Sequence, residues 1–245
     1  MENIGLQLYT VRELLGTEEQ AVETLTKIKE MGYTAVQFFG GKDRIITMGK
    51  AAKKVGLTCM GNLSDLDTYI AMGDELFELC REYDIPDLGI SSFHSDEEEV
   101  KEFVGRVNEF AAKARAEGFS FSYHNHANEF VRFASGKRIM DYFLEGFTDD
   151  VDFMPDTYWL QAGGADVRHF LEITEGRVKI LHLKDMKVTL EKSTFAEIGQ
   201  GSLWFEGIIE TAKKLGINQF AVEQDICDGD PMESAKISIN YLKKV

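Results

Sequence analysis

Cysteine is scarce in this sequence, and its scarcity excludes a fold built on disulfide bonds. The 245 residues include three cysteines, Cys59, Cys80 and Cys227, which are too few and too scattered for a disulfide framework. The N-terminus lacks the basic region and long apolar run of a signal peptide. No apolar stretch approaches the roughly 20 residues that span a bilayer. We therefore expect a cytoplasmic protein that makes no contact with a membrane.

Positive charge is scarce as well. Lys and Arg number 27 against 42 Asp and Glu, which gives a formal net charge of −15. Nucleic-acid phosphates are bound by Lys and Arg, so this balance argues against a nucleic-acid partner. Much of the acid lies on expected helices, for example at residues 97–102, where a solvated helix face accounts for it.

The sequence also lacks linker-like segments. It has three prolines and no Pro/Gly/Ser-rich or low-complexity tract, while 44% apolar residues are enough for a core. Short apolar runs alternate with amphipathic segments along the whole chain. The expected strands cover residues 4–9, 35–39, 58–60, 87–91, 119–124, 151–156, 178–183 and 220–223. The main expected helices cover residues 18–31, 44–55, 65–83, 96–118 (capped by Ser95), 137–147, 167–176 (capped by Asp166) and 232–242, and a further helix ends at Gly216.

Eight strand–helix units predict the α/β class and a single (β/α)₈ TIM barrel domain over residues 1–245. A doubly wound open sheet is the main rival, but it would not naturally use eight consecutive units. All strands of a barrel end at one rim, which is where active sites form. Side chains at distant strand ends therefore become neighbours.

Metal-capable side chains follow four of the expected strands. In residues 119–130, FSFSYHNHANEF, His124 and His126 are two apart and share one face of a strand, and Glu129 follows in the loop. Three later strands end in the same way, at Asp156, His182 and Glu223. Mixed carboxylate and imidazole ligands suit Mn²⁺, Zn²⁺, Co²⁺ or Fe²⁺. Each residue also has an ordinary explanation, such as a turn cap or a satisfied core histidine, which weakens when the residues share one rim.

These motifs resemble those of the sugar phosphate isomerase/epimerase superfamily, the xylose isomerase-like barrels, over essentially the whole chain. The resemblance rests on the segments IGLQLYTVRELL, YHNHANEF, DTYWLQAGGAD, ILHLKD, EIGQGSLWFEGII and FAVEQD. It implies one divalent metal ion held by side chains from strands five to eight. The expected ion is Mn²⁺, with Zn²⁺, Co²⁺, Fe²⁺ or Mg²⁺ as alternatives. Asp156, His182 and Glu223 take three of the ligand positions.

The fifth-strand ligand departs from the family pattern. His124 stands about where the family most often has a Glu, and Glu129 lies five residues further on. We assign Glu129 as the fourth ligand, reaching in from the loop, and direct His124 and His126 at the metal or the substrate. The alternative makes His124 the ligand, and the sequence leaves it open.

Further residues are expected around the substrate. Lys184 lies two residues after His182, so both side chains face the same side of the strand, and Lys184 could stabilise a developing oxyanion. Tyr9, Asn62, Trp159 and Asp185 are expected to contact the substrate. Asn62 and Trp159 replace histidines common in relatives, so the substrate preference stays open.

The resemblance implies an isomerase or epimerase that acts on a small sugar, cyclitol or keto-sugar through a metal-stabilised enediolate. His124 or His126 and Glu223 are the expected proton-transfer groups. The alternatives are a metal-dependent lyase or dehydratase acting on a keto-sugar, 3-keto-glycoside or inosose, an endonuclease IV-like phosphodiesterase, and a non-catalytic barrel subunit. The negative charge argues against the phosphodiesterase. A homo-oligomer is compatible with the sequence.

Overall fold

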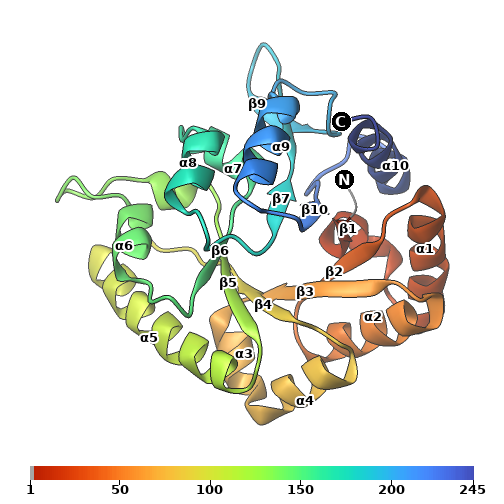
Figure 1. Cartoon of the computed structure of the whole chain (residues 1–245), viewed down its shortest axis with the longest axis horizontal. Coiled ribbons are helices and arrows are strands. Elements are labelled where there is room, and N and C mark those ends of the chain that lie inside the picture. The colour runs from red at the N-terminus through yellow and green to blue at the C-terminus, as the bar shows by residue number, and fades with distance from the viewer. Residues whose placement is uncertain (1–2) are drawn as a thin grey trace.

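Eight parallel strands form the centre of the molecule in the computed structural model, which describes residues 3–245. The strands are β1 (Ile4–Gln7), β2 (Ala35–Phe39), β3 (Thr58–Ser64), β4 (Asp87–Ile90), β5 (Ser120–His124), β6 (Asp152–Met154), β7 (Leu181–Leu183) and β10 (Phe220–Val222). Their hydrogen-bonded order is β6-β5-β4-β3-β2-β1-β10-β7. Two parallel bridges, Phe153 to Val178 and Asp156 to His182, join the two ends of the sheet. The result is a nearly closed barrel, and the expected (β/α)₈ fold is confirmed (Figure 1).

Helices surround this ring of strands (Figure 1). The α-helices are α1 (Glu18–Met31), α2 (Lys42–Val55), α3 (Leu66–Met72), α4 (Asp74–Glu82), α5 (Glu97–Ala116), α6 (Ile139–Gly146), α7 (Thr157–Ala162), α8 (Val167–Ile173), α9 (Phe205–Lys214) and α10 (Pro231–Leu242). Two 3₁₀ segments are η1 (Leu8–Leu14), which follows β1 directly, and η2 (Asn128–Phe130), which begins four residues after the end of β5. Among residues 3–245, no helix is long and apolar enough to cross a membrane.

Local sequence signals explain where the helices begin and end. Thr17 and Gln20 form a reciprocal capping box at the start of α1, and Gly32 ends that helix in the left-handed region at φ +101°. The expected helix over residues 65–83 is broken into α3 and α4 at Gly73, which has φ +60°. The cap of α5 is Asp96 rather than Ser95, because the Asp96 carboxylate accepts from the backbone N–H groups of Glu98 and Glu99.

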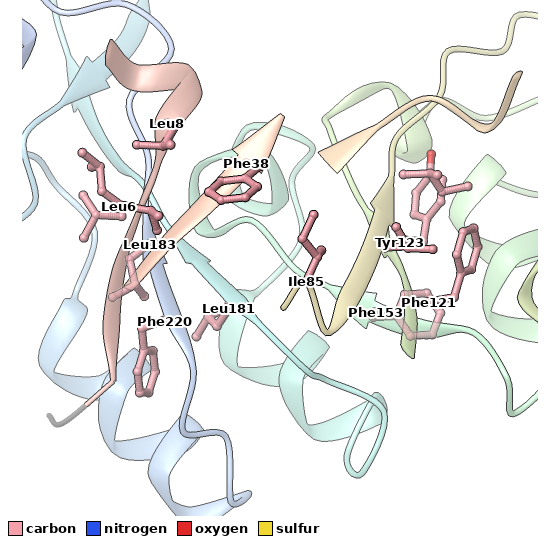
Figure 2. Close-up of a cluster of buried hydrophobic side chains, with 14 of the residues drawn as sticks. Leu6, Leu8, Phe38, Ile85, Phe121, Tyr123, Phe153, Leu181, Leu183 and Phe220 are labelled. Carbon is pink, nitrogen blue, oxygen red and sulfur yellow. The ribbon is translucent and has the colours of Figure 1, made fainter. Parts of the chain in front are cut away.

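The hydrophobic core has two layers. The outer layer lies between strands and helices and contains most of the buried aromatic and aliphatic side chains. Figure 2 shows Leu6, Phe38, Tyr123, Leu183 and Phe220 among them. The inner layer fills the barrel interior with mostly small or flexible side chains, and its members are Ala35, Met60, Met154, Ile180 and Ala221. This filling leaves open space for ligands at the rim and not along the axis.

A bulge in β3 changes which side chains face the interior. The register between β2 and β3 shifts after Val36, so Gln37 pairs with Gly61 where simple alternation predicts Met60. Met60 and Leu63, three residues apart, both pack against the inner layer. A bulge inverts the alternation beyond it. Asn62 is consequently turned away from the barrel interior.

A hairpin that the sequence did not predict projects from the rim after β7. Its strands are β8 (Asp185–Val188) and β9 (Ser193–Ala196), which pair antiparallel. None of the strands expected from the sequence covers residues 187–203. The region forms a short two-stranded sheet, of which β9 is labelled in Figure 1.

Candidate metal centre and active site

Four side chains with metal-ligating atoms converge at the carboxyl ends of neighbouring strands. His124 ends β5, Asp156 follows β6, His182 lies in β7, and Glu223 follows β10. One ligand atom from each lies within 4.8 Å of those of the other three. All four side chains are buried. The sequence placed these residues at one rim, and the structure brings them into one cluster, which we call the rim cluster.

A chain of hydrogen bonds fixes the orientation of His182. The Tyr9 backbone N–H donates to Gln7 Oε1 (3.1 Å), so Gln7 Nε2 is the atom that donates to Gln37 Oε1 (2.8 Å). Gln37 Oε1 lies 2.7 Å from His182 Nε2 and can only accept, so Nε2 carries the proton. In the neutral imidazole, Nδ1 then bears a lone pair that points at Glu223 Oε2, 3.0 Å away. Two acceptors facing each other call for a cation between them.

His124 has an equally unbalanced environment. No described residue forms a hydrogen bond with either of its ring nitrogens, although the side chain is 2% exposed. Its Nε2 lies 3.5 Å from Asp156 Oδ2 and 3.8 Å from Glu223 Oε2. Buried polar atoms without partners are rare and indicate an ion or strain. A divalent cation would satisfy these atoms.

Lys184 lies at the edge of the rim cluster and is 1% exposed. Its Nζ is 3.1 Å from Asp156 Oδ2, 2.9 Å from Glu223 Oε2 and 3.0 Å from Asp225 Oδ1. Three carboxylates around one ammonium leave two negative charges unmatched. A divalent ion supplies the missing two charges, so both the donor atoms and the charge fit such an ion.

The electrostatic consequences are visible in the acid–base properties of the cluster. Burial lowers the pKa of Lys184, but the carboxylates of Asp156, Glu223 and Asp225 outweigh burial and raise it above its usual value. Burial raises the pKa of Glu223, yet the Lys184 ammonium holds that pKa well below its ordinary range. The pKa of Asp225 is raised to about 6, first by burial and then by Glu223. Asp156, Glu223 and Asp225 are therefore ionised carboxylates around the protonated Lys184.

Glu129, the residue we expected as the fourth ligand, lies outside the rim cluster. Its carboxylate accepts from the Tyr123 hydroxyl (2.7 Å) and from the His126 backbone N–H (2.9 Å). Burial raises the pKa of Glu129 to about 7. The η2 turn points the carboxylate back towards β5 and not towards the other ligands. The geometry favours the alternative that the sequence left open, in which His124 takes the fourth position.

His126 stands beside the cluster on the wall of the active-site cavity. Its ring centroid lies 5.0 Å from that of His124 and 5.3 Å from that of Trp159. Burial, reinforced by His124 and Lys184, lowers its pKa to about 3, so the imidazole is neutral at pH 7. No residue in the described part of the chain forms a hydrogen bond with its buried Nδ1. This nitrogen is available to a ligand.

The four residues expected to contact the substrate differ in their position relative to the cavity. Tyr9 lines the cavity, and its contact with a substrate stays a prediction. Trp159 lies under the Lys184 ammonium, whose Nζ is 5.4 Å from its ring. Asn62 faces outward and donates to the Gly40 carbonyl and the Tyr69 hydroxyl, so it serves the wall of the barrel and corrects our expectation.

Asp185 also departs from the expected role. Its carboxylate accepts from the backbone N–H groups of Met186, Gly199, Gly201 and Leu203. These contacts tie the β8–β9 hairpin to the segment that leads into α9. Asp185 therefore organises a loop, and both of its carboxylate oxygens are engaged with backbone N–H groups.

Three residues of the site were missed from the sequence. Gln37 orients His182, and Asn125 accepts from the Asp156 backbone N–H (3.1 Å) and so joins the loops after β5 and β6. Asp225 completes the carboxylate shell around Lys184. A polar residue inside an otherwise apolar strand, as in AVQFF, is the signal that could have revealed Gln37.

A cavity of about 630 Å³ opens above the rim cluster. His124, His126, Lys184, Glu223 and Asp225 line one part of it. The remainder is lined by residues from η1 and from the ends of β2, β3 and β4. The volume lies within the range of about 300–1,000 Å³ that small-molecule sites occupy.

Comparison with known proteins places this geometry in context. A family model described as xylose isomerase-like TIM barrel matches residues 25–245. A search of curated protein sequences gives no significant match.

Solved structures agree in fold at low sequence identity. A sugar phosphate isomerase/epimerase from Parabacteroides distasonis ATCC 8503 superposes with a TM-score of 0.84 at 23% identity, covering 100% of this chain and 99% of that one. The apo 3-keto-D-glucoside 4-epimerase from E. coli gives 0.75 at 15% identity, with 100% of both chains covered. A protein described as IOLI with a bound zinc atom gives 0.73 at 14% identity, covering 99% of this chain and 97% of that chain.

Proposed function

Since the chain belongs to the xylose isomerase-like TIM barrel family, we propose that it is a divalent-metal-dependent isomerase or epimerase of sugars or keto-sugars. The observation that carries the proposal is the rim cluster at the floor of a cavity of sugar-binding size. The similarity to sugar epimerase structures supports the substrate class.

The rim cluster would hold the ion through His124, Asp156, His182 and Glu223. Imidazole and carboxylate ligands suit Mn²⁺, which we expect, as well as Zn²⁺, Co²⁺ and Fe²⁺. When bound, a divalent ion would polarise a substrate carbonyl and the neighbouring hydroxyl and stabilise the negative charge of an enediolate.

We assign His126 the first proton-transfer role, at the substrate carbon. It lines the cavity, and its Nδ1 is unpaired within residues 3–245. Glu223, the second group expected from the sequence, already directs Oε2 at His182 and Lys184. Asp225 also contacts Lys184, through both carboxylate oxygens, but it lines the same cavity without belonging to the rim cluster, so we assign it the second proton-transfer role.

Lys184 completes the arrangement. Its buried ammonium lines the cavity and can donate to a substrate oxygen on which negative charge develops. Its three carboxylate partners hold it in position before the substrate arrives, and one of these contacts would have to be released for donation to the substrate.

Deuterium incorporation tests this function. The Mn²⁺-loaded protein is incubated in D₂O with free keto-sugars, sugar phosphates, inososes and 3-keto-glycosides. We expect deuterium at the carbon next to the carbonyl of at least one substrate, and product analysis then separates epimerisation from elimination. The matched control is the Asp156→Ala, Glu223→Ala double variant, which should show no exchange. If the whole panel is inert while the ion is demonstrably bound, the proposal is wrong.

A further inference from the structure

The cavity extends well beyond the rim cluster. Its far part is built from a different side of the barrel, at the ends of β2, β3 and β4, and includes Phe39, Gly40, Leu63, Ser64 and Ser91. Tyr9 in η1 and Ile226 after β10 close the two sides. None of these residues belongs to the rim cluster. The far part is therefore available for a portion of the ligand that does not react.

The volume supports a ligand larger than one sugar. At roughly 30 Å³ for each water in the liquid, 630 Å³ corresponds to about 20 waters, whereas a hexose has roughly 12 non-hydrogen atoms of similar or smaller size. A monosaccharide at the rim cluster would leave the far part of the cavity filled with water.

The charges of the cavity give a phosphate group no surplus cation. Arg12 and Lys184 line it together with the carboxylates of Asp65, Glu223 and Asp225, and Asp156 lies beneath them. A divalent ion added to these groups brings the sum to zero. Arg12 Nη1 already donates to the carbonyls of Tyr9 and Asp225, both at 2.9 Å. A phosphate dianion favours a cluster of free Arg or Lys donors.

The start of α2 is the other place where a phosphate might be sought, because Gly40 lines the cavity just before it. Its first residue, Lys42, is paired with Glu75. The guanidinium of Arg44 lies 5.1 Å from the Phe39 ring and donates to the Leu15 carbonyl. Both cations beside this helix start are thus engaged elsewhere.

The far part instead presents a fixed aromatic surface. Tyr9 is 41% exposed and meets Phe39 edge to face, with ring centroids 5.5 Å apart. Arg12 lies 4.2 Å from the Tyr9 ring centroid, so guanidinium groups hold both rings. Ile226, 64% exposed, adds an apolar side chain, and the hydroxyl groups of Ser64 and Ser91 offer hydrogen bonds. We call Tyr9 and Phe39 the aromatic platform.

We propose that the aromatic platform is a second subsite, which binds an uncharged ring attached to the reacting sugar, so that the preferred substrate is a keto-glycoside and not a sugar phosphate. The proposal rests on the proposed function, since it assumes that the reacting sugar lies at the rim cluster. An apolar ring face packs on aromatic side chains, and the serine hydroxyls can hydrogen-bond to polar groups at the edge of such a ring.

Calorimetry with three related ligands tests the subsite. The Mn²⁺-loaded protein is titrated with 3-keto-glucose, its phenyl glycoside and its 6-phosphate. We expect the glycoside to bind about tenfold more tightly than the free keto-sugar, and the phosphate no more tightly than the free sugar. Equal binding of all three, or preference for the phosphate, overturns the inference.

Variants separate the platform from general effects on folding. Tyr9→Ala should reduce the glycoside preference to less than about threefold, whereas Tyr9→Phe keeps the ring and should retain it. Ile70→Ala changes an exposed side chain on α3, which does not line the cavity, and serves as the control. A preference that survives Tyr9→Ala contradicts the platform. Deuterium exchange measured on the same samples reports separately on the proposed function. The affinities of the three ligands can follow the expected ranking even where no exchange occurs.

Discussion

At the scale of single residues, a chain of amide groups decides the chemistry of His182. The backbone N–H of Tyr9 sets the orientation of Gln7, Gln7 sets that of Gln37, and Gln37 accepts the proton of His182 Nε2. Partners of this kind fix the tautomer of metal-binding histidines. Gln7 and Gln37, a polar pair buried in two apolar strands, therefore orient His182 from the interior of the barrel.

The first prediction concerns the fifth-strand ligand. His124→Gln should weaken Mn²⁺ affinity by about 100-fold or more, because it removes one of four converging ligands, while Glu129→Gln should weaken it by less than about tenfold. Titration calorimetry with Mn²⁺, on protein freed of metal by a chelator, measures the affinities of both variants. The opposite ranking would return the ligand role to Glu129 and require the η2 turn to rearrange.

Glu129 acts in this arrangement on the position of His126. Its carboxylate bridges the Tyr123 hydroxyl and the His126 backbone N–H, and it is fully buried. The motif YHNHANEF thus combines the proposed ligand His124, a residue of the cavity wall and the group that holds that residue in place. Three separate roles within six residues explain why the spacing alone did not settle the assignment.

At the scale of elements, the β8–β9 hairpin depends on one buried carboxylate. Asp185 accepts four backbone N–H groups, and a side chain at Gly201 would collide with that carboxylate. The segment GQGS at residues 199–202 is therefore held by Asp185, which accepts from the backbone N–H groups of Gly199 and Gly201. The hairpin also brings Phe195 against Trp159 (5.7 Å between centroids) beside the cavity wall.

The second prediction follows from these contacts. Asp185→Ala should lower the free energy of unfolding by about 2–4 kcal/mol, because four backbone donors lose their acceptor. It should also make residues 185–203 sensitive to limited proteolysis. Urea unfolding and mass analysis of the fragments provide the measurements. Glu191→Ala, at an exposed position of the same hairpin, should leave both unchanged. An Asp185→Ala protein with normal stability would show that the hairpin is held by other contacts.

At the scale of the whole molecule, ionisable groups are buried at both ends of the barrel. The rim cluster occupies the carboxyl ends of the strands, whereas Asp87 begins β4 at the opposite end. Asp87 Oδ1 accepts from Ser122 Oγ (2.8 Å), and Oδ2 has no hydrogen-bond partner within residues 3–245. Burial raises the pKa of Asp87 to about 6.

The third prediction is a pH dependence that arises away from the site. Because the pKa of Asp87 is higher in the folded state than its ordinary value of 3.8, its contribution to stability is complete below about pH 4. That contribution is lost as the pH rises through 6. Relative to Asp87→Asn, the wild-type protein should lose up to about 3 kcal/mol of unfolding free energy across this window. Urea unfolding at pH 4 to 7, on protein freed of metal by a chelator, measures this free energy. The control is Asp149→Asn, at an exposed position. A flat difference between wild type and Asp87→Asn would contradict a buried, proton-binding carboxyl.

The sequence by itself determined the barrel. Alternating apolar strands and amphipathic helices recur eight times, and no other common architecture uses that many consecutive parallel units. It also placed Asp156, His182 and Glu223 together, because strands of a barrel end at one rim whatever their distance in sequence. These are consequences of periodicity and of chain connectivity, which are local properties.

Tertiary structure alone decided which side chains enter the cavity. The bulge in β3 turned Asn62 outward, and the η2 turn directed Glu129 away from the other ligands and left His124 in their midst. A one-residue change of register or a single turn reverses the direction of a side chain at almost no cost in local propensity. Such choices are made by packing and hydrogen bonding across elements, so the pattern of residues along the chain does not contain them.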